Sequence, residues 1–128
     1  MNREIKFRVW VDNQFYYKCL VGNTNNTNDD NWTCPMIWLE DKKEWVNCDN
    51  GIISQYTGLK DKNGKKIFEG DIMKNKQGGI GIVKYSKYAE FILDFIDDIF
   101  VSSFNPSILR RYEVIGNIYE NDLETKGE

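Results

Sequence analysis

A regular alternation of apolar and polar residues near the start of the chain limits the secondary structure that this segment can form. Apolar side chains occupy every second position from Ile5 to Val11, and Lys, Arg and Trp fill the positions between them. A period of two places the aliphatic side chains on one face of an extended strand. Asp12-Asn13 then supplies turn chemistry, and the aromatic and apolar run over residues 15–20 suits a partner strand. We therefore expect the chain to begin with a β-hairpin.

Similar short segments, each bounded by turn residues, recur along the chain. We expect a second hairpin from residues 36–39 and 44–46, which flank a charged stretch. A third is predicted over residues 71–85, where Gly81 marks either a bulge or a close approach of two backbones. Further extended segments are predicted over residues 52–56 and 112–119.

Residues 89–96 are compatible with two periods. Phe91, Leu93 and Phe95 share one face of a strand. A helical period instead joins Ile92, Phe95, Ile96 and Ile99. We favour the strand and keep the helix as the alternative.

Two stretches lack the strand pattern. Residues 22–31 are almost entirely Asn, Thr and Asp, and we expect them to form a mobile loop. Asn105-Pro106 is typical of a helix start, with Asn105 as the N-cap and Pro106 at the first helical position. We expect a short helical turn that ends near Arg111, so helix should be a minority of the fold.

Glycine-containing corners are closely spaced in the middle of the chain. They lie at residues 57–59, 63–64 and 69–71 and would turn an extended N-terminal region onto a later meander. The pattern predicts a mainly β fold with minor α. We expect an N-terminal β-hairpin region over residues 1–56, then a small bent sheet or Src-homology-type β-barrel over residues 57–128 that ends in an acidic tail. One compact domain over residues 1–121 is the alternative division.

The sequence has no histidine among its 128 residues, which excludes hydrolases that use a Ser/His or Cys/His pair. Its cysteines, Cys19, Cys34 and Cys48, are spaced unlike a zinc ribbon or a redox pair, and we interpret them as buried hydrophobes or loop thiols in a reducing cytosol. A formal charge of −3 and a pI of about 5.1 disfavour a basic nucleic-acid coat protein. We expect no cofactor and no metal ion.

Clustered carboxylates are the residues that would best support acid–base or metal chemistry. Glu69 lies near Asp71 in the sequence, and Asp94 lies near Asp97 and Asp98. We expect these side chains to be solvated on the surface, because such chemistry needs desolvated or converging carboxylates. A small metal-assisted enzyme built on them is kept as an alternative.

A lysine-rich segment with aromatic neighbours is the strongest candidate for a binding surface. Residues 60–76 contain six lysines against three carboxylates, a local charge of +3. Cations beside rings are typical of proteins that hold single-stranded nucleic acid, although a charge of +3 is modest for that role. We therefore keep nucleic-acid binding as an alternative that is not favoured. The candidate surface comprises Tyr56, Lys60, Lys62, Lys65, Lys66, Phe68, Lys74, Lys76 and Tyr85.

All four tryptophans lie in the first half of the chain, at Trp10, Trp32, Trp38 and Trp45. Large amphipathic rings occur in cores and in subunit interfaces. We favour the core and keep the interface as the alternative.

No apolar run approaches the roughly 20 residues that a membrane span requires. The first residues lead directly into the strand pattern and not into the apolar segment of a secretion signal. We therefore expect a cytoplasmic protein that has no membrane partner.

Three segments resemble a known protein family. We find a close resemblance to the YopX family of phage and prophage proteins in residues 53–72, ISQYTGLKDKNGKKIFEGDI, and in residues 113–121, EVIGNIYEN, and residues 3–10, REIKFRVW, fit the family's start. The resemblance implies a protein of a bacteriophage or prophage that acts in the bacterial host cytoplasm and assembles into homo-oligomers. It supplies no catalytic residues, because the family is uncharacterised.

These observations favour a binding function over catalysis. We expect a non-enzymatic accessory protein that works by self-association and by contact with a host or phage protein.

Overall fold

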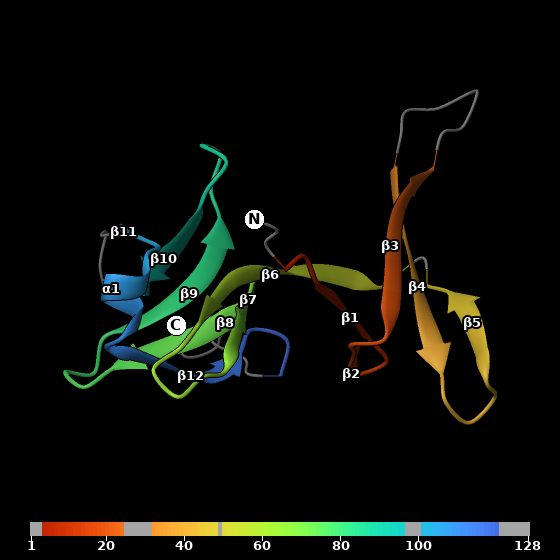
Figure 1. Cartoon of the computed structure of the whole chain (residues 1–128), viewed down its shortest axis with the longest axis horizontal. Coiled ribbons are helices and arrows are strands. Elements are labelled where there is room, and N and C mark those ends of the chain that lie inside the picture. Colours follow the sequence, from red (N-terminus) through yellow and green to blue (C-terminus); the bar gives the residue numbers. More distant parts are fainter. Residues whose placement is uncertain (1–3, 25–31, 49, 97–100, 121–128) are drawn as a thin grey trace. The chain divides into compact units, whose positions relative to one another are not determined.

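The computed structural model describes residues 4–24, 32–48, 50–96 and 101–120, and in these ranges the chain is mainly β with one short helix (Figure 1). All strand pairs are antiparallel among the described residues, and one sheet curls into a half-barrel. The predicted fold class is confirmed. In chain order the elements are β1 Phe7–Val11, β2 Gln14–Tyr16, β3 Cys19–Thr24, β4 Trp32–Leu39, β5 Glu44–Asn47, β6 Ile52–Lys60, β7 Lys66–Phe68, β8 Asp71–Asn75, β9 Ile80–Tyr85, β10 Phe91–Phe95, β11 Val101–Ser103, α1 Pro106–Leu109 and β12 Tyr112–Asn117.

The chain forms two compact units. The N-terminal unit contains Lys6–Gln55, and the C-terminal unit contains the chain from Tyr56 onward together with the residues that precede Lys6. Strand β6 crosses the border: its first residues pair with β1, whereas Tyr56 and Lys60 pair with β7. Each unit has its own cluster of buried side chains.

The expected N-terminal hairpin is present, but its second strand is shorter than predicted. Val11 pairs with Gln14 across a two-residue turn in which Asp12 and Asn13 have φ of 54° and 63°. Positive φ at both central positions matches the right-handed twist of the two strands. Strand β2 then ends at Tyr16, and the chain continues as β3 in a different sheet.

Part of the predicted loop over residues 22–31 is strand. Gly22, Asn23 and Thr24 continue β3 and pair with Cys34, Thr33 and Trp32 of β4. A neighbouring strand satisfies backbone groups whatever the side-chain polarity, so the polar composition did not prevent pairing. The rest of the predicted loop, residues 25–31, lies outside the described residues.

The predicted hairpin over residues 36–46 is confirmed, and β3, β4 and β5 form a three-stranded sheet. Its inward-facing Ile37 packs with Val9, Val11 and Cys48 in the core of the N-terminal unit. Arg8 is also buried, although its position in the alternating pattern is polar. Its guanidinium carbon lies 3.9 Å from the centre of the Phe15 ring, so a cation–π contact accompanies this burial.

The C-terminal unit is built on a five-stranded sheet with the order β11-β10-β9-β8-β12. Residues 91–95 form β10, which confirms the strand over the helix. Gly81 pairs in regular register with Met73 and Phe95, and a Cβ there would lie 3.3 Å from Leu93 Cδ2. Close approach, and not a bulge, therefore explains this glycine.

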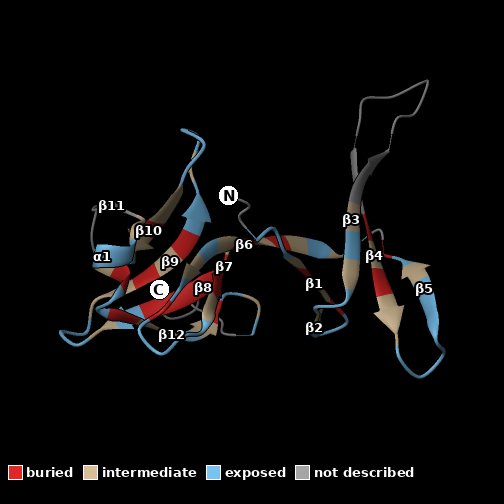
Figure 2. Cartoon of the chain, viewed as in Figure 1, coloured by how far each residue is buried: buried red, intermediate tan, exposed pale blue. Residues whose placement is uncertain are grey.

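The core of the C-terminal unit is formed by side chains from β7, from the five-stranded sheet and from α1, and Figure 2 shows these buried segments. Asn105 caps α1 by accepting a hydrogen bond of 3.1 Å from Ile108 N, and Pro106 is the first helical residue, as predicted. The helix directs Leu109 into the core. The core side chains are Ile67, Met73, Val83, Leu93, Leu109 and Tyr112.

Two expectations about side chains are wrong. Asp71 is buried and not solvated: its Oδ2 accepts a 2.8 Å hydrogen bond from Phe68 N, which closes the turn between β7 and β8. Trp10, Trp38 and Trp45 are partly or well exposed and belong to neither core cluster. Val9, Val11, Ile37 and Cys48 form the core of the N-terminal unit, and the indoles lie outside it. The side chain of the fourth tryptophan lies outside the described residues.

Candidate functional site

The candidate surface predicted from residues 56–85 does not gather into one site. Tyr56 and Phe68 are buried with their ring centres 5.6 Å apart, so neither ring is available to stack on a ligand. Lys66 Nζ lies 3.7 Å from Glu4 Oε1. Tyr85 is exposed and contacts Phe91 edge to face at 5.0 Å. Lys60, Lys65 and Lys74 are exposed.

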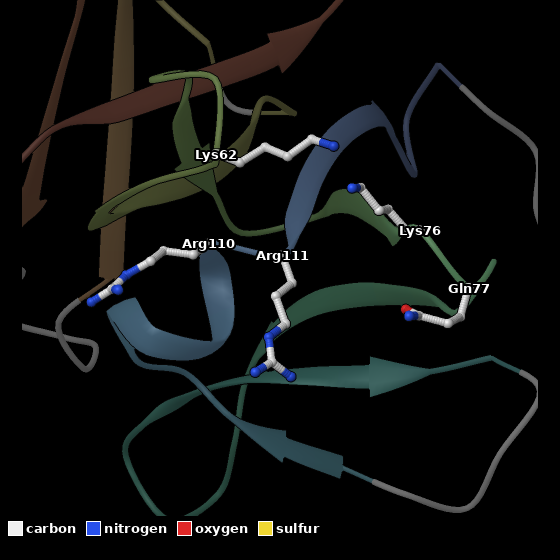
Figure 3. Close-up of a pocket in the computed structure, with 5 residues that line it drawn as sticks. All are labelled: Lys62, Lys76, Gln77, Arg110 and Arg111. Carbon is white, nitrogen blue, oxygen red and sulfur yellow. The ribbon is translucent and has the colours of Figure 1, made fainter.

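Two of the predicted lysines instead help to line a cavity of about 230 Å³ in the C-terminal unit (Figure 3). We call it the cationic cavity. It is lined by Lys62, Lys76, Gln77, Arg110 and Arg111. Sequence reasoning missed the last three. The available signal was a pair of consecutive arginines between the end of a helical turn and the start of a strand.

Backbone hydrogen bonds hold the three segments that bear these residues. Lys62 N donates to Tyr112 O at 3.1 Å, which ties the turn after β6 to β12. Lys76 and Gln77 form the tip of the β8–β9 hairpin, where Gly79 N donates to Asn75 Oδ1 at 2.8 Å. Arg111 N donates to Ile108 O at 3.1 Å at the end of α1.

The charge of the cationic cavity is only partly balanced. Lys62 Nζ lies 3.9 Å from Glu113 Oε1, at the edge of ion-pair distance. Among the residues that the structure describes, no carboxylate pairs with Lys76, Arg110 or Arg111. Such a cavity favours an anionic ligand.

A second feature lies in the N-terminal unit, on the outward side of the β3-β4-β5 sheet. Leu20 pairs with Met36, and Trp38 pairs with Trp45. Paired residues share a face, and residues two positions apart on one strand do so too, so these four side chains lie opposite the buried Ile37. We call these four residues the tryptophan face.

The tryptophan face is apolar, accessible and held in place. Leu20 is 53% exposed and Trp45 is 36% exposed. The rings of Trp38 and Trp45 meet edge to face with centres 5.3 Å apart, and Lys18 Nζ lies 4.1 Å from the centre of the Trp38 ring. Trp38 Nε1 donates a 3.0 Å hydrogen bond to Glu40 Oε1.

Glu40 stays ionised at the edge of this face over a wider pH range than an isolated glutamate. Hydrogen bonds from Lys43 and Trp38 hold the pKa of its carboxyl below the ordinary value. The tryptophan face therefore has cations and an anion at its border.

Comparison with known proteins shows the family to which the chain belongs. A family model described as "YopX protein" matches residues 6–124. The chain belongs to the YopX family.

Two solved structures resemble this YopX-family chain over almost its whole length. Protein EF1440 from Enterococcus faecalis has 24% sequence identity and a TM-score of 0.62, over 94% of this chain and 96% of that one. YopX from Bacillus subtilis has 21% identity and a TM-score of 0.57, over 91% of this chain and 94% of that one. No curated protein sequence matches this chain. At these identities the likeness supports the fold.

Neither a metal-binding cluster of side chains nor a membrane-spanning helix is present in the described part of this YopX-family chain. No group of three or more Cys, Asp or Glu residues there is arranged to hold a metal ion. None of its helical segments has the length and apolar character that crossing a bilayer demands.

Proposed function

We propose that this YopX-family chain is a non-enzymatic accessory protein, encoded by a phage or prophage and active in the host cytoplasm, that works by binding and by self-association. The observation that carries the proposal is the tryptophan face. The exposed Leu20 and Trp45 and the half-buried Met36 and Trp38 form an apolar cluster that is costly in water and has the composition of an interface centre.

A second copy of the chain is the occupant that this face fits best. Lys18, Glu40 and Lys43 place charges of both signs near the apolar centre. Across a two-fold axis, a patch of this kind meets itself, and its cations can lie opposite the partner's anion. The proposed homo-oligomer would then bind a host or phage protein with surfaces left outside the interface.

The test is the mass of the protein in solution. Size-exclusion chromatography with light scattering is expected to give a mass above the monomer for the wild type. Replacing Leu20 and Trp45 by Ser should shift the mass toward the monomer, because it removes apolar area from the centre of the interface. Circular dichroism would verify that this variant stays folded.

Tyr88→Ser is the matched control, since Tyr88 is 75% exposed and lies on the β9–β10 turn of the other unit. It should leave the mass unchanged. A monomeric wild type at high concentration, or a full-size assembly of the Leu20→Ser/Trp45→Ser variant, would contradict the proposal.

Nucleic-acid binding is the second candidate, and the observation that favours it is the set of cations at the cationic cavity. The burial of Tyr56 and Phe68 counts against a single-strand mode, which depends on stacking. Titration with labelled oligonucleotides at two salt concentrations tests this candidate, which requires binding that weakens steeply as salt rises.

The metal-assisted alternative has less support. Asp61 and Asp71 are the buried carboxylates in the described part of the chain, and each accepts hydrogen bonds from backbone N–H groups that hold a turn. Calorimetric titration with magnesium and manganese should therefore show no heat of binding.

A further inference from the structure

We propose that the cationic cavity binds the terminal phosphate group of a small phosphate ester or polyphosphate. The site lies in the C-terminal unit, away in sequence from the tryptophan face, and the inference does not depend on self-association. Among the residues that the structure describes, the lining consists of four cationic side chains and one amide and includes no carboxylate.

Two lysines of the cavity face each other, and the Glu113 carboxylate offsets the charge of Lys62 only in part. Figure 3 shows the ammonium groups of Lys62 and Lys76 pointing toward one another from two different turns. Like charges that face each other repel, and an anion between them reverses the sign of the interaction. In the same view the Arg110 side chain points away from the other four, so it contributes less directly.

Lys76 and Arg111 flank the end of one strand pair. The β8–β12 ladder ends at the pair of Asn75 with Tyr112, and Lys76 and Arg111 are the next residues along the chain on either side of that pair. Arg111 carries a planar fork of donors that matches a phosphate, and Lys62 and Lys76 each carry a point charge. Gln77 adds an amide donor to the lining of the cavity.

The backbone around the cavity is organised before any ligand arrives. At the tip of the β8–β9 hairpin, Gly78 N donates to Asn75 O and Asn75 N donates to Gly79 O, each at 3.1 Å. Asn75 Nδ2 also donates to the Tyr112 hydroxyl at 3.2 Å. A ligand therefore has to order the side chains but not the loops, which reduces the cost of binding.

The cavity fits a compact anion better than a strand of nucleic acid. Its volume of about 230 Å³ is below the range of roughly 300–1,000 Å³ that is usual for drug-sized ligands, so it accommodates one phosphate group with the remainder of the molecule outside. Lys60, Lys65, Lys66 and Lys74 do not line it. The lining cations therefore belong to one cavity and do not extend as a track along a nucleic-acid backbone.

Isothermal titration calorimetry of the full chain with inorganic pyrophosphate tests the proposal. We expect saturable binding with one site per chain. The Lys76→Ala/Arg111→Ala variant should bind at least about tenfold more weakly, because it loses charge-assisted hydrogen bonds. Arg110→Ala should weaken binding less, because the Arg110 side chain points away from the other lining residues.

Lys74→Ala is the matched control, since Lys74 is an exposed lysine on β8 that lies outside the cavity lining. It changes the net charge by one unit and should leave the affinity within about twofold of the wild type. An equal loss of affinity in Lys74→Ala and in Lys76→Ala/Arg111→Ala would mean that only overall charge matters, and it would overturn the proposal.

A second arm separates the two sources of phosphate. The same titration is run with a single-stranded oligonucleotide that lacks terminal phosphates. Binding of pyrophosphate that exceeds binding of this oligonucleotide supports the proposed site. Binding of the oligonucleotide alone, or of neither probe at millimolar concentration, overturns it.

Discussion

Asp61 joins two segments of the C-terminal unit that are 53 positions apart in the sequence. Its Oδ1 accepts hydrogen bonds from Asn63 N at 2.8 Å and from Lys65 N at 2.9 Å, and its Oδ2 accepts one from Val114 N at 2.9 Å. The side chain is buried, so these backbone donors have few alternatives. One carboxylate thus fixes the turn that carries Lys62 and attaches it to β12.

Asp61→Asn is expected to destabilise the protein although it preserves shape. An amide has one acceptor oxygen, and its NH₂ group would face a backbone donor on one of the two sides. A loss of about 1–3 kcal/mol in the free energy of unfolding is expected from urea denaturation. Asp41→Asn, in an exposed turn, should change it by less than about 0.5 kcal/mol. Equal effects of the two substitutions would argue against this role.

Cys19 gives stability a dependence on pH. Its Sγ donates to Phe7 O at 3.4 Å, and burial raises the pKa of the thiol above its ordinary value. The unfolded chain therefore loses this proton at lower pH than the folded chain does. The stabilising contribution is present at neutral pH and is lost as the pH rises past the unfolded value, near 8.5.

Comparison of the wild type with Cys19→Ala checks this sign. The difference between their free energies of unfolding should be constant near neutral pH and should shrink above about pH 8.5, because only the wild type carries the titrating thiol. Tyrosine and lysine ionisation affects both proteins alike and cancels in the difference. A difference that stays constant into the alkaline range would contradict the prediction.

At the scale of elements, turns with positive φ set the path of the C-terminal unit. Gly64 has φ of +83° in the turn between β6 and β7, and Gly70 has φ of +86° between β7 and β8. Both positions require a positive φ, but the atoms that surround them differ. A Cβ at Gly70 would lie 2.8 Å from Tyr119 Cε2, whereas one at Gly64 would meet no atom within 4 Å.

Replacing each glycine separately by Ala distinguishes the energetic cost of the backbone conformation from the cost of packing. Gly64→Ala should cost about 1–2 kcal/mol, the cost of a left-handed conformation for a residue with Cβ. Gly70→Ala should cost more, by about 1 kcal/mol, because Tyr119 must also move. Thermal or urea unfolding measures both losses. In a Tyr119→Ala background the extra cost should disappear, and its persistence there would contradict the packing explanation.

At the scale of the whole molecule, the chain builds two cores joined by one continuous strand. Val9 and Ile37 belong to the core of the N-terminal unit, and Met73 and Leu93 belong to that of the C-terminal unit. Strand β6 contributes to both units through different halves. Loss of packing in one core should therefore affect one unit first.

Ile37→Ala and Leu93→Ala test this division. Each removes a side chain that is less than 5% exposed, and each should cost about 2–5 kcal/mol in the unit that contains it. Hydrogen exchange followed by mass spectrometry should show faster exchange over β3–β5 in the first variant and over β8–β10 in the second. Uniform acceleration along the whole chain in both variants would mean that the units unfold together.

The tryptophan face and the cationic cavity differ in how many of their residues could be predicted from the sequence. The sequence identifies Trp38 and Trp45 as large amphipathic side chains, but it favours the core over an interface for them. The sequence pointed to Lys62 and Lys76 within a broader lysine surface, and it gave no reason to group them with Arg111. That grouping depends on the Lys62–Tyr112 hydrogen bond and on the β8–β12 register.

Local chemistry in the sequence determined the β class, the hairpin turns, the Asn105 cap and the family, because alternation, positive-φ residues and helix caps act over a few neighbouring residues. Only the tertiary structure decided that Asp71 is buried, that residues 19–24 join β4, and that cations from three segments line one cavity. These features depend on contacts between residues that are distant in the sequence. Such contacts are selected by packing and by backbone hydrogen bonding between strands, which a local pattern does not encode.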